Sequence, residues 1–268
     1  MNEPPPFLPE LPPQPEAFIR PTLPPPRPSV NCPPKPLGAN PEEQAPIIGL
    51  VSAMEALLRQ PRRVMFQLRQ PGAGGLILNM IGIGLVCCLV YGFVAGTFSG
   101  GPQLWAAPVK IAGGLLFAGL ICLPSLYIFT CLGGAQARLA EVTGLVAGLV
   151  ALLSVLLVGF APVALVFSQS TESLSAMGAL HILFGLVAAG FGLRFLSAGF
   201  AHFGSRGRSG LSFWSLMFLL VSLQMTTALR PIIGRSKTFF PTEKTFFLSH
   251  WGQCLMAPEK VAQPKPAF

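Results

Sequence analysis

The chain has 268 residues, of which 51% are hydrophobic and only 10% are charged, and its formal net charge is +8. Soluble domains carry about 25% charged residues, so this composition excludes an ordinary soluble globular protein. The chain contains no aspartate and three histidines, which leaves few candidates for metal binding or acid–base catalysis. Its lysines and arginines lie at the ends of apolar runs, as anchors do in membrane proteins, so we do not expect nucleic acid as a partner.

The N-terminal segment, residues 1–46, holds 17 of the 28 prolines. Runs such as Pro4–Pro6 and Pro24–Pro28 favour extended polyproline II, so we expect a disordered proline-rich tail. Such a tail is either the ligand of a polyproline-reading protein partner or a solvating spacer.

Residues 47–70 are predicted to form amphipathic juxtamembrane helices. A helix-start pattern lies at Asn40 and Pro41, with Pro46 as a second candidate start, and Pro61 divides the stretch. The helices lie on the membrane surface with their arginines at the headgroups, or they pack on the bundle. A cationic segment beside a span favours anionic lipid by about 1 kcal/mol per basic residue.

Residues 71–229 are predicted to form an all-α, polytopic transmembrane bundle of about five spans, each near the 20 residues that a crossing needs. Short connections between the spans predict antiparallel neighbours. The expected spans are Gly75–Thr97, Ala107–Cys131, Thr143–Phe167, Ala176–Phe200 and Leu211–Leu229.

The last segment, residues 230–268, is basic and aromatic, and we expect part of it to lie at the membrane interface. Arg138 marks the second loop and Arg206 and Arg208 the fourth, whereas the first loop region contributes only Lys110. Together with the arginines before the first span, this asymmetry predicts a cytoplasmic N-terminus. Five crossings would place the basic C-terminal tail outside, and the alternative is a re-entrant fifth segment with four crossings.

Four polar residues in or beside the spans are candidate intramembrane or lipid contacts: Asn79, Glu141, His181 and Arg194. A charge near the middle of a membrane costs about 2.5–3.5 kcal/mol. Arg194 therefore either faces the bundle interior, paired with Glu141 or with an anionic headgroup, or extends toward the interface. His181 and Asn79 either line a polar path or are satisfied residues of the bundle interior.

Glycines at four-residue spacing are candidate helix-packing positions, because they let helix backbones approach closely. They are Gly92, Gly96 and Gly100 in one run and Gly144 and Gly148 in another. The packing is either within one chain or between copies in a homo-oligomer.

No catalytic or cofactor motif is visible in the sequence. None of the six cysteines forms a C-x-x-C pair, and metalloprotease, phosphate-loop and nucleophile-elbow patterns are missing. A Ser–His–Asp triad needs an aspartate. We therefore expect no enzymatic activity, no metal and no cofactor.

Residues 54–203 contain an amphipathic approach (Glu55 to Arg63), then glycine-bearing spans with Tyr91-Gly92 in the first and Leu123-Pro124-Ser125-Leu126-Tyr127 in the second. This arrangement resembles the bacterial branch of the Ypt-interacting-protein (YIP) family of five-span membrane proteins. The resemblance implies a non-enzymatic protein of the bacterial cytoplasmic membrane with a cytoplasmic N-terminal tail. Eukaryotic members bind small GTPases in membrane traffic, and no residue here carries that role over.

We expect a membrane organiser or adaptor whose tails and surface helices recruit protein partners or anionic lipid. The alternative is a component of a transporter or channel with a polar path near Arg194. The first function requires a dry, glycine-packed bundle, and the second requires a polar cavity near the middle of the membrane.

Overall fold

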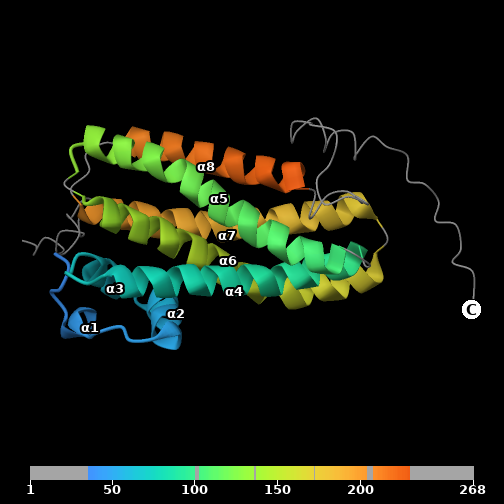
Figure 1. Ribbon diagram of the computed structural model, residues 1–268, viewed down its shortest axis with the longest axis horizontal. Helices are drawn as coiled ribbons and strands as arrows, with labels where there is room; N and C mark the ends of the chain where they lie inside the picture. Colours follow the sequence, from blue (N-terminus) through green and yellow to red (C-terminus); the bar gives the residue numbers. More distant parts are fainter. Residues whose placement is uncertain (1–35, 100–102, 136, 172, 204–207, 230–268) are drawn as a thin grey trace, which may run out of the picture. The chain divides into compact units, whose positions relative to one another are not determined.

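The computed structural model describes residues 36–99, 103–135, 137–171, 173–203 and 208–229, and in these the regular structure is entirely α-helical (Figure 1). The eight helices in this part of the chain are α1 (Pro41–Gln44), α2 (Leu50–Arg59), α3 (Pro61–Leu68), α4 (Gly74–Ser99), α5 (Gln103–Leu132), α6 (Leu139–Ser170), α7 (Leu174–His202) and α8 (Arg208–Leu229). Each predicted span coincides with one long helix, α4 to α8.

Four helices, α4 to α7, are long and apolar enough to cross a membrane. The described apolar part of α8, Gly210–Met225, is shorter, at about 24 Å of helix against a hydrocarbon core of about 30 Å. The all-helical class and four candidate spans are thus confirmed, while a fifth crossing stays a prediction.

Helix α6 forms the centre of the bundle, and half of its most apolar stretch is buried by other helices. It packs between α4 and α7, α4 also packs on α5, and α8 lies along α5 (Figure 1). The contact between α8 and α7 is slight. The bundle is therefore well packed around α6 and loosely closed between α7 and α8.

Helix α8 is fixed to α5 by a buried tryptophan. The Nε1–H of Trp214 donates a 2.8 Å hydrogen bond to the carbonyl oxygen of Cys122, and the indole stacks on Phe218 with ring centroids 5.3 Å apart. Both aromatic side chains are fully buried. A buried indole N–H needs such a partner, so this bond sets the register of α8 on α5.

Residues 36–68 form what we call the platform, which packs where α4 and α6 begin and where α7 ends (Figure 1). Helix α1 starts at the predicted Pro41, but α2 starts at Leu50 rather than Pro46. The expected tail boundary at residue 46 moves as well, because Pro36 onward is held by hydrogen bonds from α3. Residues 1–35, which are most of the predicted N-terminal tail, and residues 230–268, the predicted C-terminal tail, lie outside the described residues.

One placement made from charge alone needs correction. The charge pattern predicts Lys110 in the first loop region, but Lys110 lies in α5, seven residues after the helix begins at Gln103. Apolar neighbours on both sides, from Leu104 to Ile111, extend the helix past the lysine.

Candidate functional site

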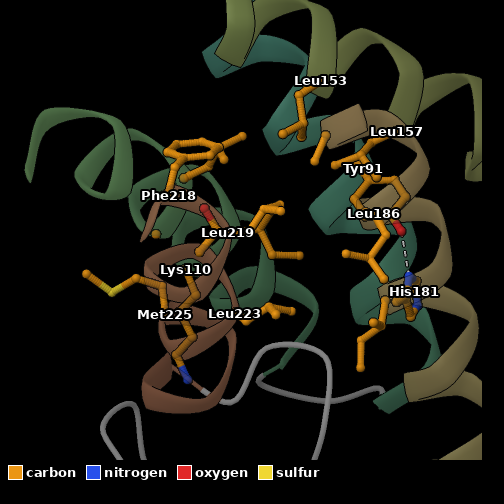
Figure 2. Close-up of a pocket in the computed structure, with 17 residues that line it drawn as sticks. Tyr91, Lys110, Leu153, Leu157, His181, Leu186, Phe218, Leu219, Leu223 and Met225 are labelled. Carbon is orange, nitrogen blue, oxygen red and sulfur yellow. Dashed lines mark hydrogen bonds between the residues drawn. The ribbon is translucent and has the colours of Figure 1, made fainter. Parts of the chain in front are cut away.

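The described helices enclose an apolar cavity of about 120 Å³, open on one side (Figure 2). It separates the α5–α8 pair from α4, α6 and α7. The cavity lies in the half of the bundle away from the platform, because Tyr91 is in the second half of α4 and both Lys110 and His181 are in the first eight residues of their helices. Its walls are mainly aliphatic and aromatic, including Ile111, Leu153, Leu157, Leu186, Phe218 and Leu219.

A hydrogen-bonded pair, Tyr91 and His181, lies in the cavity wall. Tyr91 Oη and His181 Nδ1 are 2.6 Å apart, and the rings meet edge to face with centroids 5.6 Å apart. Both side chains are buried, and Figure 2 shows the bond across the wall formed by α4 and α7. The pair satisfies both polar groups and ties the two helices together. No carboxylate lines the cavity among the described residues.

Two further polar groups line the cavity. Lys110 is buried, and Figure 2 shows its amine directed away from Tyr91 and His181, toward the end of the bundle opposite the platform. Ser222 Oγ is buried without a hydrogen-bond partner among the described residues. The cavity thus combines an apolar interior with a cation at one end.

The other polar residues predicted from the sequence lie elsewhere. Asn79 lines a cleft of about 300 Å³ at the start of α4, together with Gln67 and Gln70. Glu141 is buried at the start of α6, where its Oε2 accepts the backbone N–H of Arg138 at 2.9 Å. A carboxylate in the first turn caps the helix and complements its dipole, which accounts for Glu141 structurally.

Arg194 is exposed on the outside of α7. It lies six residues, or about 9 Å, from the central residue of this helix, Ala188, on the side of the platform. The structure does not pair it with Glu141, since neither ion pair among the described residues involves either side chain. This position suits a side chain that extends along the helix toward the membrane interface. The four predicted polar residues are therefore not brought together into one path.

Three of the predicted glycine positions lie at helix contacts within the chain. A Cβ added to Gly92 would overlap Pro108 Cα and lie 3.0 Å from Pro108 N, so α4 and α5 cross here backbone to backbone. A Cβ at Gly148 would lie 2.6 Å from Phe195, and one at Gly144 would overlap Leu68. Gly96 is buried, and Gly100 lies outside the described residues.

A second candidate site is the surface of α2, which has three different sides. Ala53, Ala56 and Leu57 are buried against the protein. Ser52, Glu55 and Arg59 form a polar side, with Arg59 Nη1 3.3 Å from Glu55 Oε1. Between these two sides lies an exposed apolar side with Leu50, Val51, Met54 and Leu58. Together with Ile48, which is exposed two residues before the helix begins, we call it the α2 apolar face.

A contact with α4 shows how far along that helix the α2 apolar face lies. The side chain of Leu50 contacts the Gly82 position of α4, where an added Cβ would lie 3.8 Å from Leu50 Cδ2. Gly82 is eight residues, or about 12 Å, beyond the start of α4 at Gly74. Helix α2 therefore lies beside the first third of α4 rather than beyond its end (Figure 1).

The platform is held rigid by a buried carboxylate. Glu43 Oε1 accepts a 2.7 Å hydrogen bond from Arg62 Nε, and Oε2 accepts one of 2.7 Å from the N–H of Gly38. The bond from Arg62 lowers the pKa of Glu43 below its ordinary value; burial opposes this, and the bond from Gly38 adds to it. Gly38 adopts φ +85°, and Phe66 leaves no room there for a side chain.

Arginine and glutamine side chains of α3 hold the segment between α1 and α2 in place. Arg63 donates to the carbonyls of Ala45 and Pro46 at 2.9 Å each. Gln67 accepts the N–H of Ile47 at 3.0 Å and donates to the carbonyl of Ala45. These bonds fix the linker between α1 and α2, and with it the start of α2.

Sequence reasoning missed Tyr91 as the partner of His181, Lys110 as a cavity residue and Trp214 as the link to α5. The pair Tyr91–His181 spans 90 positions and the pair Cys122–Trp214 spans 92. The available signal was the residue type, because a tyrosine or tryptophan within an apolar span needs a polar partner.

Comparison with known proteins finds no matching family model, and neither a curated protein nor a solved structure matches the chain. The likeness to the YIP family consequently rests on the sequence features quoted for it.

Proposed function

We propose that this chain is a non-enzymatic integral membrane protein that organises the membrane surface, with α2 as its lipid-contacting element and the proline-rich tail as its recruiting element. The α2 apolar face is the observation that carries the proposal. Its most exposed residues, Ile48 and Val51, are 80% and 74% exposed. An isolated soluble domain rarely presents such a face.

The three sides of α2 match the three surroundings of a helix at a membrane surface. One side packs on protein, one presents apolar side chains and one presents Glu55 and Arg59. If α4 enters the membrane near Gly74, the start of α2 beside Gly82 reaches the boundary between headgroups and acyl chains. Interfacial helices bury their apolar side about 5–10 Å into that boundary, which agrees with this placement.

The platform also supports a role in presenting the tail. Arg62 Nη2 donates to the carbonyl of Pro36 at 3.1 Å, so the chain is anchored to α3 where the described residues begin. A protein bound to residues 1–35 would be held close to the membrane surface. This arrangement suits an adaptor.

The bundle favours this function over a transporter or channel component. Its cavity is lined mainly by apolar side chains, and Arg194 lies outside it. The glycine contacts at Gly92 and Gly148 pack helices of one chain against each other. A polar route through the described helices has no such support.

The proposal includes the orientation inferred from the basic residues, with a cytoplasmic N-terminus in a bacterial cytoplasmic membrane. The proposal also includes five crossings, with α8 as the fifth, and membership of the YIP family. The apolar character of α8 and its packing along α5 support the fifth crossing.

Photocrosslinking to lipid tests the proposal. The photoreactive residue benzoylphenylalanine is placed at Val51 or at Arg59, whose residue and side-chain exposures are similar, 74% and 77%. The full chain is reconstituted into phospholipid vesicles, irradiated and analysed by mass spectrometry. We expect adducts to lipid acyl chains at position 51 in several-fold excess over position 59, which stands on the headgroup side of α2.

Equal lipid adducts at the two positions would refute the proposal. Adducts at position 51 that join two copies of the chain would refute it as well, and would identify the α2 apolar face as a homo-oligomer contact instead.

A further inference from the structure

The cavity is lined by both α7 and α8, which contact each other only slightly. Leu186 of α7 lines the cavity and is also 47% exposed, so it marks the opening. On the other side of the opening, α8 contributes Leu219 and Leu223. Because α7 is long and apolar enough to cross a membrane, the medium at this opening is lipid hydrocarbon rather than water.

We propose that the cavity binds one acyl chain of an acidic phospholipid, which enters between α7 and α8 and places its phosphate near the Lys110 ammonium. This site is separate from α2, so a failed test of the cavity site would not affect the proposed function of α2, and the reverse also holds.

The size and lining of the cavity suit a segment of hydrocarbon. A dry apolar cavity of about 150 Å³ accepts a molecule of the size of benzene, and this cavity measures about 120 Å³. Its lining runs from His181 to Ala189 on α7, which corresponds to about 12 Å along the helix. An elongated apolar space of this kind fits several carbons of one chain.

Lys110 supplies the preference for an acidic headgroup. It lies seven residues, or about 10 Å, from the start of α5, and its amine is directed toward that end (Figure 2). Lysine side chains near helix ends extend toward the headgroups in this way. Lys110 is a basic residue in an otherwise mainly apolar lining, and its charge favours an anionic headgroup over a neutral one.

Trp214 offers a built-in reporter for the occupant. It is fully buried and stacks on Phe218, which lines the cavity. The double variant Trp105→Phe, Trp251→Phe leaves Trp214 as the remaining one of three tryptophans. The full chain is reconstituted into phosphatidylcholine vesicles and titrated with phosphatidylglycerol brominated in mid-chain, because bromine quenches tryptophan fluorescence at short range and Trp214 lies directly behind the cavity residue Phe218. We expect quenching of Trp214 that saturates at low mole fraction.

Two glycines of α7 provide a blocking variant and its matched control. A Cβ added to Gly185 or to Gly190 would meet no atom within 4 Å, so both positions accept a side chain. Gly185 lines the cavity, whereas Gly190 is exposed and does not. We expect Gly185→Leu to abolish the saturable quenching and Gly190→Leu to retain it.

Lys110→Gln tests the headgroup. We expect it to weaken the binding of brominated phosphatidylglycerol by about fivefold, to the level of brominated phosphatidylcholine. Quenching that rises linearly with mole fraction, or that is equal in the Gly185 and Gly190 variants, would overturn the site. An unchanged preference for phosphatidylglycerol in Lys110→Gln would overturn the assignment of an acidic lipid.

Discussion

The crossing of α4 and α5 at Gly92 yields the sharpest prediction about stability. In Gly92→Ala, the added Cβ would lie 3.0 Å from Pro108 N and 3.2 Å from the carbonyl oxygen of Ala107, and it would overlap Pro108 Cα. Non-bonded heavy atoms prefer about 3.5–4.0 Å. All three obstacles are backbone atoms, which no side-chain rotation removes, so the helices must separate by about 1 Å or more.

The expected cost is that of overpacking, about 1–3 kcal/mol. Replacing glycine by alanine within a helix also brings a gain in helix propensity of up to about 1 kcal/mol. Gly190→Ala isolates this gain, since an added Cβ there meets nothing within 4 Å. The difference in the free energy of unfolding between the two variants therefore measures the steric cost alone.

Thermal unfolding of both variants in the same mild detergent provides the assay. For a chain of this size, 1 kcal/mol corresponds to about 2–4 °C in Tm, so Gly92→Ala should unfold about 2–12 °C below Gly190→Ala. Equal Tm values for the two variants would refute the backbone contact between α4 and α5.

Three other changes test the remaining contacts. A double-mutant cycle with Tyr91→Phe and His181→Leu should give a coupling free energy of about 0.6–1.7 kcal/mol, the range found for hydrogen bonds between membrane helices; additive effects would contradict the bond. Trp214→Ala should destabilise the protein by about 3–5 kcal/mol, whereas Trp105→Ala, at a position 74% exposed, should leave the Tm nearly unchanged; equal effects would disprove the docking of α8. The pKa of Glu43 is lowered in the fold, so its ionised form stabilises the platform above the unfolded pKa, and this contribution is lost as pH falls through the folded pKa. Hydrogen exchange in residues 36–47, corrected for intrinsic rates, should therefore increase over that acidic interval in the native chain but not in Glu43→Gln. Identical exchange profiles for the two proteins would argue against this role of Glu43.

The long helices of the bundle could be predicted from the sequence because the length and hydropathy of a helix depend only on its own residues. Each of the helices α4 to α7 is a continuous apolar run, and the residues that make it so are its own. The amphipathic pattern of residues 47–70 likewise predicted α2 and α3. It left open whether these helices face lipid or the bundle; in the structure α2 packs one side on the protein and leaves another apolar side exposed.

Features that depend on distant partners were not predictable. Proline content indicated disorder up to residue 46, but the order of residues 36–46 comes from hydrogen bonds donated by Arg62, Arg63 and Gln67. His181 was noticed as a polar residue, yet its meaning depends on Tyr91, 90 positions away. Charge alone placed Lys110 in a loop, and only packing places it in the wall of a cavity.

Arg194 shows the opposite case, in which a prominent sequence signal leads to no assembled site. Its charge within an apolar run made it the strongest candidate for a polar path. In the structure it is exposed on the outside of α7, forms no ion pair with Glu141 and does not line the cavity. A single residue can reach the interface along its own helix, so its presence does not require a partner in the bundle.

The composition of lipid retained around the protein tests the central claim, that α2 organises lipid at the membrane surface. The full chain is reconstituted into phosphatidylcholine vesicles with a minor fraction of phosphatidylglycerol and extracted with a polymer that keeps the surrounding lipid. Arg59 stands on the polar side of α2 with its side chain 77% exposed, so Arg59→Gln removes a headgroup contact worth about 1 kcal/mol. We predict that phosphatidylglycerol is enriched over its bulk fraction around the native chain and that Arg59→Gln lowers this enrichment; bulk composition around both proteins would contradict the account.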